Sequence, residues 1–400
     1  MPLNDRLDAV GDYSFDRLRA LLGGVEPPAD VTPIALSLGE PQHAPPAFLA
    51  ETIAREAAGW SKYPLVRGTD PARTAIADWL TRRYGLPGGM VDPDTMVIPV
   101  SGTREALFMV ALAAVPERKN GEKPVVLMPN PFYQVYLGAA VTAGAEPVLV
   151  PADRQNGFLP NYAALPDDIL ARTALAYYCS PANPQGAIAS METMKQLVEL
   201  ARAHDFLLVS DECYSELYYA EPPTGAAEAC AALGDIGNDG MKNVVAMNSL
   251  SKRSSAPGLR SGFVAGDADL IRRFARLRDY GGAPPPLPLQ AAATALWSDE
   301  EHVIANRAIY AAKYESAAEI LEGKYGYYTP DGGFYLWLDV GDGEDAARRL
   351  WAEAGVRVIP GEYLAREADG HHPGAGYIRL ALVHDLETTR DALTRITNVL

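Results

Sequence analysis

Apolar segments alternate with helical stretches along most of this chain, and this alternation constrains the fold more than any other feature. Between about residues 50 and 285, runs such as 97–100, 174–179 and 206–211 have the character of short buried strands separated by helices. Continuous apolar strands joined by helices are typical of a parallel sheet covered on both faces, with right-handed connections. We therefore expect an α/β fold with a mostly parallel, doubly wound sheet.

The length of 400 residues exceeds what one hydrophobic core usually holds, so we expect two lobes. A proline-rich stretch at 283–288 marks the boundary between them. A helical run at 289–322 follows, and strands are expected at 333–339, at 356–360 and around Arg379. We predict a large cofactor-binding domain of residues 50–285, and a smaller α+β domain formed by residues 1–49 with 286–400.

Composition excludes several classes of function. The net charge of −16 disfavours a nucleic-acid surface. Cys179, Cys213 and Cys230 do not have metal-ligand spacing, and three cysteines do not suggest a disulfide framework, which fits a reducing cytoplasm. The adjacent His371 and His372 lie in a polar loop, so we expect no metal site. The start of the chain lacks an apolar signal region, and no stretch has membrane-spanning length. We expect a cytoplasmic protein without nucleic-acid or membrane partners.

The segment 249–263 carries the strongest chemical signal. Lys252 lies between Ser249 and Ser251, and Arg260 follows eight positions later, after a Pro-Gly turn. The lysine is a covalent handle, while two hydroxyls and a guanidinium can converge on one anion. This combination suits a cofactor with both an aldehyde and a phosphate, such as pyridoxal 5′-phosphate (PLP), with Lys252 bonded to the aldehyde and the other three side chains on the phosphate. The alternative is a basic loop with ordinary turn chemistry.

Two further segments offer partners for the ring of such a cofactor. Asp211 ends an apolar run, and ligands of open α/β sheets bind outside the carboxyl ends of strands. There its carboxylate can keep a pyridine nitrogen protonated, and Tyr214 can bond the phenolic oxygen. Asn183 precedes Pro184, which biases it away from helix, and its amide can donate to the same oxygen. Alone, Asp211 could be a helix cap or metal ligand, and Asn183 part of a plain turn.

Two more segments can be interpreted as cofactor contacts. Ser101, Gly102 and Thr103 stand between a strand and a helix, where backbone N–H groups attract phosphate. The common alternative is a helix start capped by Ser101 or Thr103. Tyr133 offers a ring that can stack on the cofactor, or else pack in the core.

Arg379 lies inside an otherwise apolar strand near the end of the chain. A buried guanidinium needs an anionic partner, because burying it unpaired is costly. That partner can be the α-carboxylate of a substrate or a carboxylate of the protein itself.

In this order and spacing, the segments resemble the class I/II aminotransferases of PLP fold type I over nearly the whole chain. Within that family, the chain is most similar to the N-succinyldiaminopimelate aminotransferases. The resemblance rests on the strings at 36–41, 102–108, 129–136, 210–216, 249–254, 257–267 and 331–337.

The resemblance implies a function for each candidate residue. Lys252, Asp211 and Tyr214 would be catalytic, and Arg379, Gly39 and Asn183 would bind substrate. The remaining cofactor contacts would be Gly102, Thr103, Tyr133, Ser249, Ser251 and Arg260, together with Tyr63, which would reach the phosphate in the partner subunit of a homodimer. The implied reaction converts N-succinyl-LL-2,6-diaminopimelate and 2-oxoglutarate to N-succinyl-2-amino-6-oxopimelate and glutamate by ping-pong kinetics, in lysine biosynthesis.

Other functions are compatible with the same residues. An aminotransferase for aspartate, an aromatic or an acetylornithine-like amino acid, or a carbon–sulfur lyase, would use the same cofactor contacts. A regulatory module that keeps the fold without catalysis is a further alternative. In close relatives the segment at 280–290 carries a histidine after the tyrosine, and this chain lacks it. Because the resemblance places this segment at the entrance of the active site, the departure bears on which substrate is selected.

The strongly acidic chain poses a problem, because both proposed substrates are anionic. Local basic residues must overcome the overall field. The candidates are Arg67, Arg104 and Arg253, although each could be an ordinary surface charge.

Overall fold

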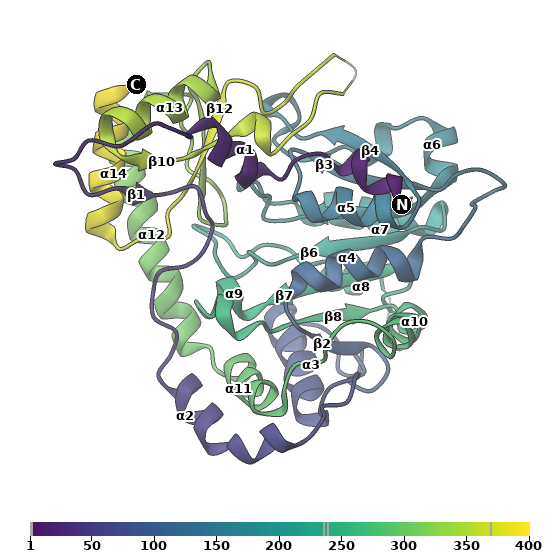
Figure 1. The fold of residues 1–400 in the computed structure, drawn as a ribbon. Coiled ribbons are helices and arrows are strands. Elements are labelled where there is room, and N and C mark those ends of the chain that lie inside the picture. Colours follow the sequence, from purple (N-terminus) through teal and green to yellow (C-terminus); the bar gives the residue numbers. More distant parts are fainter. Residues whose placement is uncertain (1–2, 235–236, 238–239, 369) are drawn as a thin grey trace.

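The computed structural model describes residues 3–234, 237, 240–368 and 370–400, and its centre is a sheet of seven strands (Figure 1). The order is β2-β8-β7-β6-β5-β3-β4. Strands β4, β3, β5, β6 and β7 run parallel, whereas β8 is antiparallel to both β7 and β2. The expected mostly parallel sheet is confirmed. Its strands are β2 Val97–Val100, β3 Val125–Asn130, β4 Glu146–Pro151, β5 Thr173–Cys179, β6 Leu207–Asp211, β7 Val244–Ser249 and β8 Gly262–Gly266.

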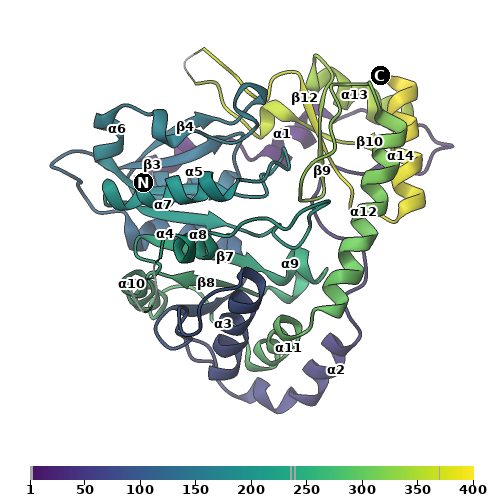
Figure 2. The ribbon, with the colours of Figure 1, turned by 180° about the vertical axis from the view of Figure 1, so that it is seen from behind.

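Helices cover both faces of this sheet, as Figures 1 and 2 show from opposite sides. Along β3, Val125 and Leu127 join one hydrophobic core while Val126 and Met128 join the other, because successive side chains point to opposite faces. The strands therefore carry continuous apolar runs. The first core includes α3 Asp70–Tyr84, α6 Asp167–Arg172, α7 Met191–Ala203 and α8 Ala226–Ala232, and the second includes α4 Thr103–Ala114, α5 Gln134–Thr142 and α10 Ala268–Arg278.

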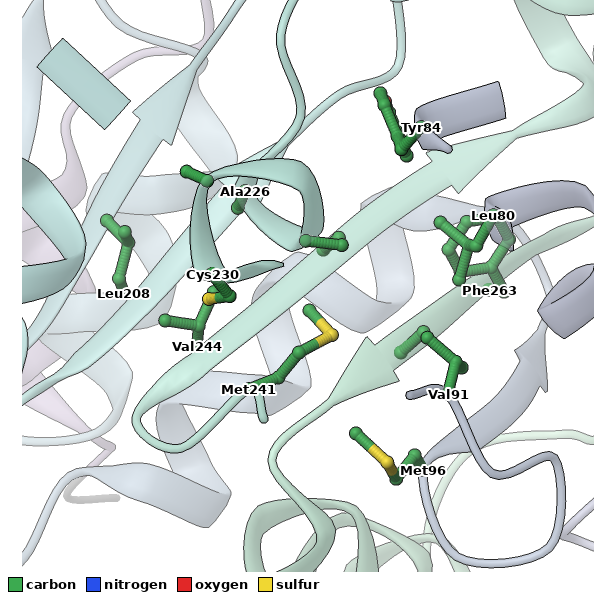
Figure 3. Packing of buried hydrophobic residues seen from close by; sticks show 14 of the residues in the cluster. Leu80, Tyr84, Val91, Met96, Leu208, Ala226, Cys230, Met241, Val244 and Phe263 are labelled. Atoms are coloured by element: carbon green, nitrogen blue, oxygen red, sulfur yellow. The ribbon is translucent and has the colours of Figure 1, made fainter. Parts of the chain in front are cut away.

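Figure 3 shows part of the first core, where apolar side chains of helices and strands pack together. Leu80 from α3 packs beside Phe263 of β8, and Ala226 and Cys230 of α8 face Val244 of β7. All five side chains are fully buried. Close packing of this kind resists small displacements, so the strand ends that leave this layer are held in place.

A second, smaller lobe contains an antiparallel sheet in the order β11-β12-β9. The strand expected at 356–360 is divided between two sheets, because β10 pairs with β1 from the start of the chain while β11 pairs with β12. The elements are β1 Ile34–Ala35, β9 Tyr335–Asp339, β10 Val356–Arg357, β11 Ile359–Pro360, β12 Tyr377–Ala381, α12 Glu301–Leu321, α13 Gly343–Ala354 and α14 Leu386–Val399.

The helical run expected at 289–322 is broken into two helices. Helix α11 ends at Ser298 and α12 begins at Glu301; between them, the carboxylate of Asp299 accepts a hydrogen bond from the backbone N–H of His302 at 3.1 Å. The remaining helices are α1 Ser14–Leu21, α2 Phe48–Arg55, α9 Leu250–Arg253, α11 Leu287–Ser298, η1 Asp5–Val10, η2 Ala57–Ser61, η3 Arg154–Asn156, η4 Tyr162–Ala164, η5 Pro257–Leu259 and η6 Gly361–Tyr363.

Two contacts bear on the predicted domain boundaries. Helix α11 packs against α2 and α3, and η1 packs against α5. The division at residues 49 and 285 stays a prediction. Among the described residues, no helix is long and apolar enough to cross a membrane.

Candidate active site

A cavity of about 620 Å³ opens between the carboxyl ends of the central strands and the smaller lobe. It brings together residues that are far apart in the sequence. Of the predicted site residues, those that line it are Gly39, Thr103, Tyr133, Asn183, Asp211, Tyr214, Ser249, Ser251, Lys252, Arg260 and Arg379.

Lys252 lies on α9, a four-residue helix that begins directly after β7. Its ammonium donates a hydrogen bond to the carbonyl oxygen of Gly39 and lies 5.0 Å from the ring centroid of Phe334. Burial, together with the nearby guanidinium of Arg379, lowers the pKa of Lys252 to about 8, while Cys213 opposes this shift. An amine with such a pKa is available both as a nucleophile and as a base near neutral pH.

Asp211 is the last residue of β6, and its side chain is buried at the floor of the cavity. One carboxylate oxygen accepts a hydrogen bond from the Tyr136 hydroxyl at 2.6 Å, and the other from the backbone N–H of Cys213 at 3.3 Å. Burial raises the pKa of Asp211, and these hydrogen bonds oppose the rise. No lysine or arginine of the described chain forms an ion pair with it, so a cationic ligand group can take that place.

The first turn of α4 faces the cavity without a side-chain cap. The capping alternative is therefore not what the structure has: Ser101 donates to the carbonyl oxygen of Ala283 at 2.6 Å, and the Thr103 hydroxyl contacts the Cys213 sulfur at 3.0 Å. Gly102 has a φ of 85°, and a Cβ there would lie 2.2 Å from a nitrogen of Arg260. The uncapped N–H groups can bind an anion.

Arg260 and the two serines complete this anion-binding corner. The Arg260 guanidinium donates to the backbone carbonyls of Pro257 at 2.9 Å and of Ser101 at 3.3 Å. It has no carboxylate partner among the described residues, and the hydroxyls of Ser249 and Ser251 make no hydrogen bond within the described chain. These unused donors are the types that hold a phosphate.

Arg379 reaches the opposite side of the cavity from β12. Its guanidinium donates to the side-chain oxygen of Asn183 at 3.1 Å and to the carbonyl oxygen of Ser37 at 2.8 Å, and it lies 4.3 Å from the Tyr335 ring centroid. The Arg379 Nε is buried without a hydrogen-bond partner. Within the described chain no internal salt bridge forms, so a carboxylate ligand can supply the missing anion.

The aromatic candidates lie around the same space. The Tyr133 hydroxyl accepts a hydrogen bond from Nε of Arg104 at 2.9 Å. The hydroxyls of Tyr214 and Tyr335 lie 3.1 Å apart. The amide nitrogen of Asn183 has no hydrogen bond within the described chain, so it remains available to a ligand.

Two predicted residues do not line the cavity. Gly102 contributes through the backbone at the start of α4. The side chain of Tyr63 is fully exposed, and its proposed contact with a partner subunit stays a prediction.

The three candidate arginines have different environments. Arg67 donates to the carbonyl oxygen of Asp94 at 2.6 Å and lies outside the cavity. Arg253 is fully buried and donates to Leu296 and Glu300, both at distances below 3 Å. Arg104 alone of the three lines the cavity.

Sequence reasoning missed the contributions of Tyr136, Cys213 and Tyr335. A signal for Tyr136 was present, because it follows the candidate Tyr133 by only three positions; in the structure Tyr133 directly precedes α5 and Tyr136 lies in its first turn. The proximity of Tyr335 to Tyr214 had no local signal, since the two lie on different lobes.

Comparison with known proteins identifies the class. The family described as aminotransferase class I and II matches residues 31–396. The LL-diaminopimelate aminotransferase of Aquifex aeolicus is 31% identical over 405 residues, covering 99% of this chain and 98% of that protein. A solved aminotransferase structure from Neisseria meningitidis has a TM-score of 0.92 at 38% identity, with 99% of each chain covered, and the aminotransferase AspB from Helicobacter pylori has a TM-score of 0.87 at 35% identity, covering 97% of this chain and 98% of that one.

The chain therefore belongs to the class I and II aminotransferases, whose members use PLP. The cavity fits this cofactor on observations of its own. Within the described chain it contains a lysine amine, a buried carboxylate that forms no ion pair, and an uncapped helix start near two hydroxyls without hydrogen bonds and a guanidinium without a carboxylate partner. More specifically, the curated relatives with the name LL-diaminopimelate aminotransferase include those of Moorella thermoacetica, at 30% identity over 99% of this chain and 97% of that protein.

Proposed function

We propose that this aminotransferase acts on N-succinyl-LL-2,6-diaminopimelate with 2-oxoglutarate as amino acceptor, as a homodimer. The observation that carries the proposal is a second guanidinium without a carboxylate partner in the described chain. Arg104 uses only its Nε, in the bond to Tyr133, and lines the same cavity as Arg379. Arg379 would take the α-carboxylate, and Arg104 would take a carboxylate at the other end of the substrate.

Charge balance favours the succinylated substrate. The side chains that line the cavity and are not assigned to the cofactor include Arg104 and Arg379 but, as a carboxylate, only Glu40 in the described chain. N-Succinyl-LL-diaminopimelate carries three carboxylates and one ammonium, whereas LL-diaminopimelate carries two of each. A site with excess positive charge favours the more anionic compound. The same local positive charge would attract an anionic substrate to a protein whose overall charge is negative.

The residues would share the chemistry as follows. The bound cofactor supplies an electron sink for the electron pair left when a substrate Cα–H bond breaks. The Lys252 amine would remove that proton, hold it, and later give it back to the reacting atoms. A pKa of about 8 permits both steps, because the amine can accept and release a proton near neutral pH. Arg379 would orient the Cα–H bond toward Lys252 by holding the α-carboxylate.

Unsuccinylated LL-diaminopimelate is the second candidate substrate, because several relatives carry that enzyme's name. Titration of the PLP-loaded protein with each compound, without keto acid, separates the two. We expect N-succinyl-LL-diaminopimelate to convert the bound cofactor to its amine form at concentrations at least about tenfold below LL-diaminopimelate. The reverse order would establish the second candidate. Conversion by neither, with conversion by aspartate or an aromatic amino acid, would reject both. Release of a thiol and ammonia from a sulfur amino acid such as cystathionine would indicate a carbon–sulfur lyase.

Arg104→Gln tests the assigned contact in the same titration. Loss of a charge-assisted hydrogen bond costs about 1.5–3 kcal/mol, so we expect about ten- to hundredfold weaker binding of N-succinyl-LL-diaminopimelate. Binding of alanine, which lacks a distal carboxylate, should not change. Arg67→Gln is the matched control, because Arg67 lies outside the cavity. Equal losses for both amino acids would contradict a distal contact.

Exposed apolar side chains support the proposed homodimer. Trp60, Tyr63, Leu65 and Tyr280 are 54%, 101%, 75% and 79% exposed. Large exposed apolar side chains in neighbouring segments are typical of subunit interfaces. Sedimentation of the purified protein measures its oligomeric state. A fully active monomer would contradict the proposed homodimer.

A further inference from the structure

We infer that Tyr136 is a positioning residue that acts on the cofactor through Asp211, by holding that carboxylate ionised and aimed at the ring nitrogen. The inference rests on the cofactor of the family and on the proposed pairing of Asp211 with the ring. It does not depend on which diaminopimelate derivative is the substrate.

The geometry joins the two side chains directly. The Tyr136 hydroxyl lies 2.6 Å from one oxygen of Asp211, and both side chains line the cavity. The other oxygen accepts the backbone N–H of Cys213 at 3.3 Å, and the Cys213 thiol also interacts with the carboxylate. A carboxylate has about four acceptor sites, so these donors leave room for a further donor from the cavity side.

The direction of the hydrogen bond is fixed. Tyr136 is fully buried, and burial beside the Asp211 charge raises the pKa of its phenol well above the usual value, so the phenol keeps its proton and donates. Asp211 has no cationic partner in the described chain, and burial alone would favour its protonated form. Donation from the phenol stabilises the ionised form.

The phenol is itself held in place by aromatic contacts. Its ring stacks on Tyr177 at a centroid distance of 4.4 Å and an interplanar angle of 9°, and the Tyr177 hydroxyl donates to the carbonyl oxygen of Leu107 at 2.6 Å. Tyr133, the proposed stacking partner of the cofactor ring, meets the Tyr136 ring edge-on at 5.7 Å. One turn at the start of α5 would therefore set both the plane of the cofactor ring and the orientation of its ionic partner.

Removing the donor has a definite consequence. Without Tyr136, the Asp211 carboxylate is more basic and competes for the proton that the ring nitrogen must keep. The ionic pairing between carboxylate and ring weakens, and contacts with the phosphate are unaffected. The loss is therefore confined to a cofactor that has a ring nitrogen.

The test compares two cofactors on Tyr136→Phe. The apoprotein is titrated with PLP and with its 1-deaza analogue, in which C–H replaces the ring nitrogen. We expect about ten- to hundredfold weaker binding of PLP and binding of the analogue within about twofold of the unaltered protein. At saturating PLP, kcat should fall by about tenfold or more with little change in KM. A merely structural role would weaken the binding of both cofactors equally, and that result would overturn the inference.

Tyr178→Phe is the matched control. Tyr178 is a fully buried tyrosine of β5 whose hydroxyl has no hydrogen-bond partner in the described chain, and it does not line the cavity. Both cofactors should bind it as they bind the unaltered protein. In Asp211→Asn, adding Tyr136→Phe should cause no further loss, and a further loss of full size would also overturn the inference.

Thermal unfolding of the apoprotein shows whether Tyr136→Phe is folded. If it is not, a second variant tests the same hydrogen bond. 3-Fluorotyrosine at position 136 keeps the shape of the side chain and makes its phenol more acidic. The ratio of the two dissociation constants, PLP to analogue, should then change by about threefold or more. An unchanged ratio would overturn the inference.

Discussion

The two walls of the active-site cavity have different origins. The cofactor wall, formed by Asp211, Ser249, Ser251, Lys252 and Arg260, comes from segments that directly follow β6 and β7 of the large sheet. The substrate wall, formed by Gly39, Tyr335 and Arg379, comes from the start of the chain and from two strands of the small lobe. The first wall comes from two short segments at the carboxyl ends of neighbouring strands, and the second exists only once the lobes meet.

The two walls also differ in how the rest of the structure holds them. The cofactor wall stands on strand ends that the packed cores hold in place. The substrate wall is joined to it by few direct bonds: Lys252 donates to Gly39, Arg379 donates to Asn183, and Tyr214 contacts Tyr335. We therefore propose that the first wall holds the cofactor rigidly and that the second wall selects the substrate.

Lys252→Ala tests the cofactor wall and has the largest expected effect. We expect kcat to fall by about 10⁴-fold or more, because the variant loses both its covalent handle and its base. Borohydride reduction followed by mass spectrometry should attach the cofactor to the unaltered protein but not to the variant. Lys195→Ala, at a partly exposed lysine of α7 that lies outside the cavity, is the control. Normal turnover by Lys252→Ala would reject the assignment.

Arg379→Leu tests the substrate wall. Loss of the charge-assisted bonds to the α-carboxylate costs about 2–3 kcal/mol, so kcat/KM should fall by about 30- to 150-fold for every amino acid. Cofactor binding should change by less than about threefold. Arg379→Lys keeps the charge without the planar fork and should recover part of the loss. An equal loss in cofactor affinity would break the separation of the two walls.

Lys313→Met tests the attachment of the substrate wall and has the smallest expected effect. Lys313 of α12 donates to the carbonyl oxygen of Leu382 and contacts His43 Nε2, both at 2.7 Å, and thereby ties the segment that carries Gly39 to the small lobe. Burial lowers the pKa of Lys313 to about 7, with Asp385 opposing, from 10.5 in the unfolded chain.

The sign of the pH dependence follows from these two values. Between about pH 7 and 10 the unfolded chain binds the lysine proton and the folded protein does not, so the lysine's contribution to stability rises with pH. The difference in unfolding free energy between unaltered protein and Lys313→Met should therefore grow in favour of the unaltered protein, with a slope approaching about 1 kcal/mol per pH unit. Urea denaturation from pH 6.5 to 9.5 measures it, with Lys195→Met as control. Parallel curves would contradict the shifted pKa.

The parallel sheet and the cofactor wall could be predicted from the sequence because both depend on local patterns. An apolar run that ends in Asp211, and a lysine between Ser249 and Ser251, carry their signal within a few residues. The division of 356–360 between two sheets could not be predicted, because it depends on which distant strand lies beside each half.

The three candidate arginines show most clearly what could not be predicted from the sequence. Arg67, Arg104 and Arg253 are alike as sequence features, yet one lies outside the cavity, one lines it, and one is buried beside Glu300. The relation of Tyr136 to Asp211 is similar, since the two are joined only when α5 packs on the central sheet.

By itself, the sequence determined the alternation of strands and helices, the family and the residues that suit PLP, because these depend on periodicity and on groups a few positions apart. Only the tertiary structure decided which arginines face the cavity without a carboxylate partner in the described chain and which tyrosine donates to Asp211. The physical reason is that burial and pairing depend on neighbours brought together from distant positions, and a side chain's charge is available for binding only where those neighbours leave it unpaired.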